Sequence, residues 1–199
     1  MIKKNRFALA LLGMLAAPLA QAQAEDYTPY FGIGLGVVGL EETAPTFSQK
    51  NDVFGGFVRG GVDFNDYIGA ELRVGTAMKG KKSYPAGTVD PLASSVELEG
   101  QYFVSYLLKL QFPVMSNLKL YALGGGTTAK LKTTITTSAG SASTKAVKIG
   151  ASYGAGLDYA FGDNSSVGAE WMQYWTNVAI APNTKAKIWS GVLTWSQQF

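Results

Sequence analysis

The stretch VELEGQYFVSYLLKLQF, residues 96 to 112, decides the fold, because apolar and polar side chains alternate along it. A period of two predicts a β-strand that separates an apolar from a polar environment. The apolar face holds Leu98, Tyr102, Val104, Tyr106, Leu108 and Leu110, and the other face holds Glu97, Glu99, Gln101, Ser105, Lys109 and Gln111.

The same alternation recurs on both sides of this stretch. It predicts further strands at 30–40, 52–64, 67–75, 118–132, 146–161, 166–175 and about 185–199. Short turns at 65–66, 113–117 and 162–165 alternate strictly with long or polar links at 41–51, 81–95, 133–145 and about 178–184, which we expect to be mobile loops. This pattern predicts an all-β fold, an eight-stranded antiparallel up-and-down barrel with its loops at one rim.

The facing of the strands distinguishes a soluble ligand-binding barrel from a transmembrane one. A soluble barrel buries its apolar side, whereas a membrane barrel turns that side outward. The predicted strands are long enough to cross the hydrocarbon when tilted. Aromatic side chains near strand ends are typical of interfacial girdles, and here they are Tyr30, Tyr67, Tyr159, Trp171, Trp175, Trp189 and Trp195. The chain ends in LTWSQQF, with Leu193, Trp195 and Phe199 on one face, and these features favour a transmembrane β-barrel.

The first 24 residues have the pattern of a secretory signal peptide. A basic start, MIKKNR, precedes the apolar run FALALLGMLAAPLA and the small residues AQAQA. We expect cleavage after Ala24, with Ala22 as the alternative, so that 25–199 form the barrel domain. The basic residues of this leader account for the whole net charge of +3, so the charge does not indicate nucleic acid binding. The chain has no cysteine and therefore no disulfide framework.

Charged side chains recur on the face that the alternation assigns to the lumen. An eight-stranded barrel has an interior just wide enough for side chains, so we expect these charges to pair as a network that fills it. In the hairpin around 65–66, the period of two places Arg59 opposite Glu71 or opposite Arg73, and like-charge repulsion disfavours Arg73. The predicted lumen charges are Arg59, Glu71, Arg73, Glu97, Glu99, Lys109, Lys148, Asp158 and Glu170.

Together, the leader, the alternating strands, the long and short links and the aromatic end resemble the small outer-membrane β-barrel family of Gram-negative bacteria, of the OmpA/OmpX/OmpW type. The resemblance implies a location in the outer membrane. It also implies that Gly191, Leu193, Trp195 and Phe199 form the signal by which the barrel-assembly machinery recognises its clients. Gln197 departs from the family pattern, which has an aromatic or apolar residue there.

Catalytic chemistry is restricted by the composition. The chain has no histidine and no cysteine, whereas enzymes among outer-membrane barrels resemble one another in using a histidine acid or base. A carboxylate pair at Glu97 and Glu99 is conceivable, but pairing with Lys or Arg is the simpler interpretation. We therefore expect no catalytic, cofactor or metal site.

The expected role is that of a monomeric, non-enzymatic barrel with a structural or surface-interaction function through its extracellular loops. Its expected partners are outer-membrane lipids, lipopolysaccharide, the assembly machinery and a possible surface ligand. The basic cluster at 79–82 could bind the phosphates of lipopolysaccharide. The alternative is transport, as a small-solute porin or a hydrophobic-ligand channel. The lumen distinguishes the two, because a filled interior opposes passage.

Overall fold

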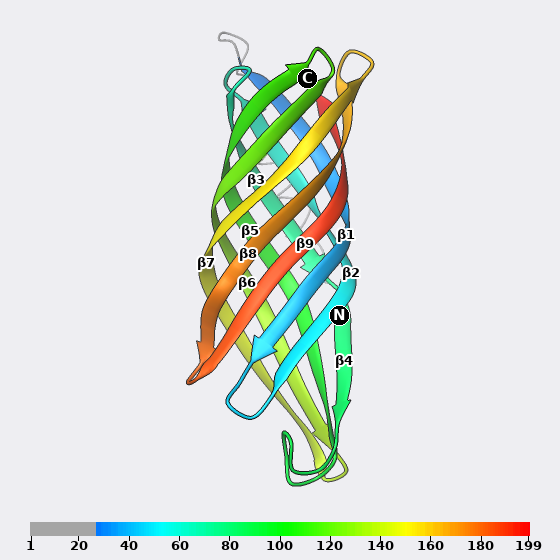
Figure 1. Cartoon of the computed structure of the whole chain (residues 1–199), viewed down its shortest axis with the longest axis vertical. Helices are drawn as coiled ribbons and strands as arrows, with labels where there is room; N and C mark the ends of the chain where they lie inside the picture. Colours follow the sequence, from blue (N-terminus) through cyan, green and yellow to red (C-terminus); the bar gives the residue numbers. More distant parts are fainter. Residues whose placement is uncertain (1–26) are drawn as a thin grey trace, which may run out of the picture.

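The computed structural model describes residues 27–199, which form a single antiparallel sheet (Figure 1). The predicted signal peptide, 1–24, lies outside the described residues. The strands are β1 (Thr28–Thr43), β2 (Ser48–Asp63), β3 (Ile68–Ala77), β4 (Lys79–Tyr84), β5 (Ser94–Met115), β6 (Leu118–Thr137), β7 (Gly140–Phe161), β8 (Ser165–Ala181) and β9 (Thr184–Gln198). Within these residues no helix is long and apolar enough to span a membrane.

The sheet closes into a ring of eight strands, which confirms the predicted barrel. The hydrogen-bonded order is β3-β2-β1-β9-β8-β7-β6-β5, and β3 pairs with β5 to close the ring. The short strand β4 also pairs with β5, so it continues the line of β3 after Met78. Because every strand of the ring has two neighbours, the ring has no free edge there.

Three short links lie at one end of the ring, as predicted, and we call this the turn end. They join β2 to β3, β5 to β6 and β7 to β8 through 64–67, 116–117 and 162–164. The two ends of the described chain also meet here, because the Phe199 amide donates a hydrogen bond to the Pro29 carbonyl at 3.0 Å.

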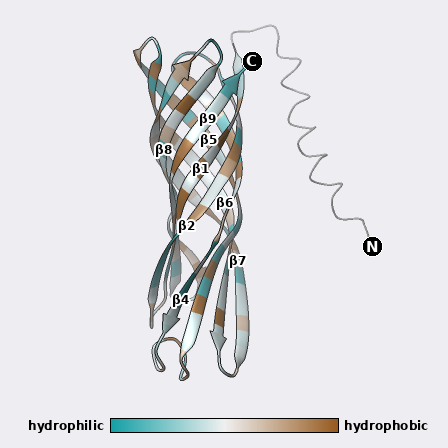
Figure 2. Cartoon of the chain, turned by 90° about the vertical axis from the view of Figure 1, so that its right-hand side faces the viewer, coloured by the Kyte–Doolittle hydropathy of each residue, from teal (hydrophilic) through white to brown (hydrophobic). Residues whose placement is uncertain are grey.

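The outer face of the ring is apolar, as the alternation predicts for a membrane barrel. Along β1, Phe31, Ile33, Leu35 and Val37 are all exposed, with Leu35 at 51%. Figure 2 shows hydrophobic and hydrophilic positions alternating along the strands. In β9 the apolar Leu193 is exposed while Thr194 and Ser196 face inward and are buried.

The inner face of β1 is lined by glycine because a large ring from the next strand lies against it. A Cβ atom at Gly34 would lie 2.5 Å from Cζ of Phe57. The absence of a side chain at this position therefore makes room for the buried Phe57 ring, which fills the barrel interior.

At the end opposite the turn end, the ring opens into two separate sheets. The β7–β8 ladder stops at Tyr153 and Gln173, and the β2–β3 ladder stops at Gly55 and Ala77, although the strands continue. Figures 1 and 2 show the hairpins diverging there. We call these sheets the β1 arm (38–54 and 174–190) and the β5 arm (79–100 and 129–152).

The arms pack against each other through apolar side chains on their facing sides. The β1 arm supplies Val38, Leu40 and Ile188, and the β5 arm supplies Val96, Leu98 and Leu131, all 4% exposed or less. Side chains also bond across the contact: Gln49 Nε2 donates to the Val96 carbonyl at 3.1 Å, and Thr133 Oγ1 donates to Glu42 Oε2 at 2.6 Å.

The arms replace most of the loops expected from the sequence. The links 41–51, 133–145 and 178–184 were predicted to be mobile loops, and that is wrong: only 44–47, 138–139 and 182–183 lie outside strands there. Residues 85–93 alone form a longer irregular link at this end of the described chain. The β1–β2 extension buries Glu42 and Gln49 against the opposite arm, whereas residues 138–145 of the β6–β7 hairpin are exposed on both faces and are held by the β6–β7 ladder alone.

Candidate functional site

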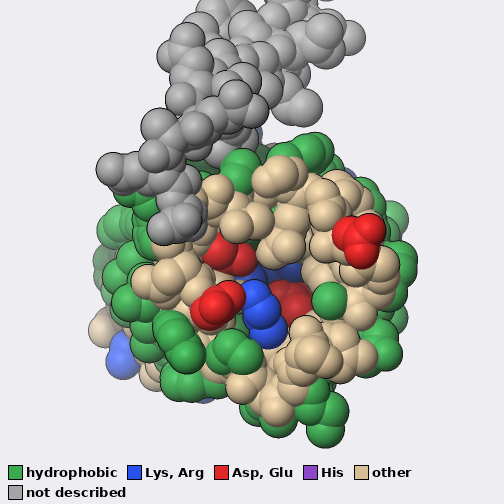
Figure 3. Space-filling model, turned by 90° about the horizontal axis from the view of Figure 1, so that it is seen from above, with side chains coloured by type: hydrophobic (Ala, Val, Ile, Leu, Met, Phe, Trp, Pro, Cys, Tyr) green, Lys and Arg blue, Asp and Glu red, His purple; other side chains and the backbone are tan. Residues whose placement is uncertain are grey.

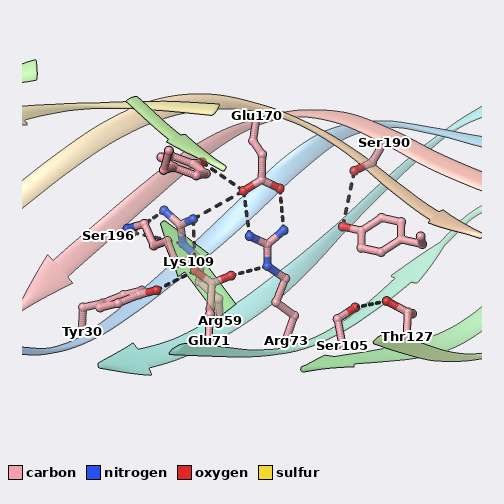
Figure 4. A network of polar contacts seen from close by, with 12 residues as sticks. Tyr30, Arg59, Glu71, Arg73, Ser105, Lys109, Thr127, Glu170, Ser190 and Ser196 are labelled. Atoms are coloured by element: carbon pink, nitrogen blue, oxygen red, sulfur yellow. Dashed lines mark hydrogen bonds and ion pairs between the residues drawn. The ribbon is translucent and has the colours of Figure 1, made fainter. Parts of the chain in front are cut away.

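Six charged side chains from five strands meet inside the ring, and Figure 4 labels all of them except Asp158. They are Arg59 (β2), Glu71 and Arg73 (β3), Lys109 (β5), Asp158 (β7) and Glu170 (β8), and we call them the central network. Three are cationic and three are anionic. Each lies on the inward face of its strand, so the closed barrel brings the six side chains together and no loop residue is needed.

Arg73 is the most enclosed member of the network. Its side chain is 0% exposed, its Nη2 donates to Glu170 Oε2 at 2.7 Å, and its Nε donates to Glu71. The guanidinium carbon also lies 4.5 Å from the centroid of the Phe57 ring. One planar cation therefore holds two buried carboxylates while its face packs on an aromatic ring.

Arg59 connects the remaining carboxylate to the same cluster. Its Nη2 donates to Ser196 Oγ at 2.6 Å, and its guanidinium nitrogens lie 3.5 Å from Glu71 and 3.6 Å from Asp158. Arg59 is directly opposite Arg73 in the register, the arrangement that like-charge repulsion was expected to disfavour. That expectation is wrong because the carboxylates of Glu71 and Glu170 bind both guanidinium groups.

Two tyrosines complete the network. Tyr30 Oη donates to Glu71 Oε2 at 2.7 Å, and Tyr121 Oη donates to Glu170 Oε2 at 3.0 Å. Lys109 Nζ lies 5.0 Å from each of these ring centroids and 3.4 Å from Asp158 Oδ2. The cation is thus held between two aromatic faces and one carboxylate.

Aromatic side chains close the interior on the arm side of the network. The Phe103 ring lies 6.4 Å from that of Phe57 and 4.8 Å from that of Tyr174, measured between centroids. These three rings and Met172 are 5% exposed or less, and the apolar contact between the arms continues beyond them. The interior therefore consists of an ionic layer followed by an apolar plug.

On the other side of the network the interior opens into a small cavity at the turn end. Its volume is about 70 Å³, and its wall includes Asp63, Lys109, Gln111 and Asp158. Figure 3, viewed from this end, shows basic and acidic side chains at the bottom of the hollow. The cavity ends at the central network and does not continue into the apolar plug.

Three of the predicted lumen charges lie elsewhere. Glu97 and Glu99 were expected in the lumen, but they face outward on the β5 arm, with Glu97 3.2 Å from Lys79 Nζ and Glu99 3.7 Å from Lys132 Nζ. A β-bulge between Gly100 and Tyr102 inserts one residue into β5 and reverses the facing of everything before it. Val96 and Leu98 therefore point inward instead.

Lys148 is also outside the network. It lies on β7 opposite Ala129 of β6, beyond the point where the β7–β8 ladder ends, and it is exposed. No ion pair joins it to another side chain within residues 27–199. Lys148 has the alternation of an inward-facing residue, but its side chain reaches solvent because β8 has separated from β7 at this point.

Several interior residues were missed or misassigned at the sequence level. Tyr30 and Trp175 were expected in the interfacial girdles but are 3% and 0% exposed. Tyr30 is separated by an even number of residues from the inward-facing glycines Gly32 and Gly34 of β1. This alternation is a signal that could have placed Tyr30 inside the barrel. For Trp175 a register shift after Gln173 turns the side chain inward, and its Nε1 donates to the Thr127 carbonyl at 3.1 Å.

The C-terminal residues lie on the outer wall. Leu193, Trp195 and Phe199 are 73%, 36% and 75% exposed, and Gly191 lies on the same face. Their apolar surface is continuous with the outer face of β1, because Ile33 pairs with Trp195 and Leu35 with Leu193.

Comparison with known proteins gives one family and several solved barrels. The family model for the outer membrane protein beta-barrel domain matches residues 7–196. No curated protein matches the chain.

Among solved structures, Neisserial surface protein A is similar with a TM-score of 0.53 and 14% identity, covering 86% of this chain and 97% of that one. The Yersinia pestis attachment invasion locus protein Ail, in complex with the heparin analogue sucrose octasulfate, is similar with a TM-score of 0.50 and 16% identity, covering 86% of this chain and 99% of that one. At identities this low, the similarity shows a shared fold alone.

Proposed function

The chain belongs to the outer membrane protein beta-barrel domain family, and we propose that it is a non-enzymatic, monomeric barrel that binds ligands at the bacterial surface through its two arms. Proteins of this family reside in the outer membrane of Gram-negative bacteria, so the apolar outer wall contacts lipid. The turn end then faces the periplasm and the arms face outward.

The observation that carries the proposal is the closed interior. The central network and the plug of Phe57, Phe103 and Tyr174 occupy consecutive layers of the ring. A solute would have to displace a buried, hydrogen-bonded Arg73 and several aromatic rings to pass. With transport disfavoured, the arms are the part of the protein available for function.

Two features of the arms suit surface binding. The first is the free edge of β7, whose residues before Tyr153 pair only with β6. Unpaired strand edges are ready templates for an additional extended segment.

The second feature is the excess of lysine on the arms. Acidic side chains on the arms and their links are fewer, namely Glu41, Glu42, Asp52, Asp90, Glu97 and Glu99. An anionic ligand is therefore favoured. The lysines are Lys50, Lys79, Lys81, Lys82, Lys130, Lys132, Lys145, Lys148, Lys185 and Lys187.

Lipopolysaccharide phosphates are the anionic groups nearest to this surface in an outer membrane, and we propose them as partners of the lysines. A sulfated sugar carries similar charge, and Ail is known in complex with one. Sucrose octasulfate is therefore a suitable soluble probe of the arms.

Conductance tests the closed interior. Refolded protein in a planar bilayer should show no stable single-channel currents. Well-resolved currents that change in the Glu71→Ala variant would overturn the proposal in favour of transport, because that side chain lies in the central network.

Binding tests the arms. Sucrose octasulfate should bind the detergent-solubilised protein with an affinity that falls as salt is added. Replacing Lys145 and Lys148 by Gln should weaken binding, whereas Lys119→Gln at the turn end is the matched control and should not. Equal binding by both variants would refute a role for the β5 arm.

Assembly is a separate proposal that rests on the exposed C-terminal face. We propose that Gly191, Leu193, Trp195 and Phe199 are recognised by the barrel-assembly machinery before the chain folds. Deletion of Phe199 should then reduce outer-membrane insertion, whereas Gln198→Ala should have little effect. Normal surface levels of the deletion variant would show that Phe199 is only the end of an ordinary strand.

A further inference from the structure

The outward face of the β5 arm changes from apolar to basic within one residue pair. On β7 the outward side chains Ile149 and Val147 are 62% and 51% exposed, and the next residue on the same face is Lys145. On the neighbouring strand β6, Lys130 pairs with Val147 and Lys132 pairs with Lys145. The apolar wall therefore ends at three lysines on one face, and we call Lys130, Lys132 and Lys145 the lysine cluster.

The length of the apolar wall places this cluster at the edge of the membrane. The outward apolar side chains of β5 run from Phe112 to Tyr102, and a transmembrane strand needs about 9 to 11 residues to cross the hydrocarbon. Tyr102 is directly opposite Lys130, whose Nζ lies 5.9 Å from the centroid of the tyrosine ring. Tyrosine is typical of the membrane–water interface. The cluster therefore lies at the level of lipid headgroups, in the outer leaflet if the arms face outward as proposed above.

The protein does not neutralise the cluster. Lys132 Nζ lies 3.7 Å from Glu99 Oε2, but no carboxylate within residues 27–199 lies within 4.0 Å of Lys130 or Lys145 Nζ. Lys132 and Lys145 are directly opposite each other on adjacent strands, and like charges in this arrangement destabilise a strand pair. The acidic side chain that β6 and β7 carry, Asp158, faces the interior. An anion bound from outside would relieve the repulsion.

The spacing of the three lysines suits one phosphate group. Directly opposite residues have Cβ atoms about 4.5 to 5.5 Å apart, and Lys130 and Lys132 are two residues apart on one strand, or about 7 Å. Each lysine has a flexible stem and an ammonium group with three hydrogen-bond donors. All three ammonium groups can therefore approach the oxygens of a single phosphate.

We propose that the lysine cluster binds the phosphate of an outer-leaflet glycolipid, with the acyl chains of the lipid lying along Ile149, Val147 and Tyr102. This inference rests on the proposed function, because it assigns the contact with lipopolysaccharide phosphates to one face of one arm. A soluble anion meets lysines on both faces of the β5 arm. A lipid headgroup meets only the face that continues the membrane wall, and that face excludes Lys148.

Binding of lipid A, the phosphorylated anchor of lipopolysaccharide, tests the proposal. The protein in detergent is mixed with rising concentrations of diphosphoryl lipid A, and native mass spectrometry measures the fraction that carries one lipid. Lys145→Gln should raise the Kd about fivefold, the effect expected for one lysine near an anionic membrane surface. Lys130→Gln should have a similar effect, and lipid A without its phosphates should bind the wild-type protein more weakly.

Lys148→Gln is the matched control. Lys148 is three residues from Lys145 on the same strand, is also exposed and has no ion pair within residues 27–199, but it lies on the opposite face. The Kd for lipid A should stay unchanged in this variant. Equal losses in Lys145→Gln and Lys148→Gln would mean that only the overall charge of the arm matters, which refutes the cluster. Equal affinity for lipid A with and without phosphates would also refute it.

Two further measurements separate this inference from the proposed function. Hexaglutamate that binds as tightly as lipid A, with the same loss in Lys145→Gln, would identify a soluble acidic chain as the ligand and overturn the choice of a lipid. Sucrose octasulfate binding together with lipid A binding that is insensitive to Lys145→Gln would refute the lipid site but leave the surface-binding role intact. Lipid A binding that depends on Lys145 without any binding of sucrose octasulfate would support the lipid site and count against that wider role.

Discussion

Replacement of Arg73 by Met is the sharpest test of the central network. Methionine keeps much of the side-chain volume but removes the cation that bonds to both Glu71 and Glu170. These side chains are 0% exposed, so water does not replace the lost bonds. Breaking a buried ion pair by removing one partner costs about 3 to 5 kcal/mol, and we expect a loss of that size in the free energy of unfolding.

The loss should be measured by urea unfolding of the protein folded into lipid vesicles, followed by tryptophan fluorescence. Lys79→Met is the matched control, because its ion pair with Glu97 is largely exposed and contributes roughly 0 to 1 kcal/mol. Adding Glu170→Gln to Arg73→Met should cost less than the sum of the two single changes, since the second removes the carboxylate that the first left unpaired. A loss for Arg73→Met no larger than that of the control would refute a buried network.

Three further predictions concern the arms, the plug and processing. Burial raises the pKa of Glu42 in the β1 arm, and the Thr133 hydrogen bond only partly opposes this rise. The folded arms therefore favour the protonated form of Glu42. The contact between the arms should weaken as pH rises from below the ordinary glutamate pKa through the raised pKa of Glu42. Hydrogen exchange of the β5 arm should show this weakening, Glu42→Gln should remove it, and a pH dependence unchanged in that variant would contradict the assignment. Gly34→Val should destabilise the barrel by about 1 to 3 kcal/mol through collision with Phe57. Gly60→Val should cost less in the same urea assay, because no atom lies within 4 Å of a Cβ placed at Gly60. Equal losses would show that Phe57 does not limit the space at Gly34. Finally, the intact mass of exported protein should begin at Glu25, and unboiled protein should migrate differently from boiled protein on a detergent gel; a mass that retains 1–24 would refute the predicted cleavage.

The sequence by itself determined the architecture of the wall. A period of two separates two environments regardless of which partner strand lies alongside, so the apolar face of β1 and the outward Leu193 and Trp195 could be predicted from alternation alone. The three short turns were also predictable, because Asn, Asp, Gly and Pro mark them locally. The convergence of Arg59, Glu71 and Arg73 inside the ring likewise follows from their phase on uninterrupted strands.

Tertiary structure decided what depends on partners distant in sequence. The bulge after Gly100 reverses the facing of Glu97 and Glu99, and nothing in the local alternation marks it, because apolar and polar residues alternate on both sides of the inserted Gln101. The register that sets Arg59 opposite Arg73 is tolerable because Glu71 and Glu170, the latter 97 residues beyond Arg73, each supply a carboxylate that both guanidinium groups share. The arms likewise could not be predicted from local alternation, since the polar sequence 133–145 forms strands through the long ladder between β6 and β7.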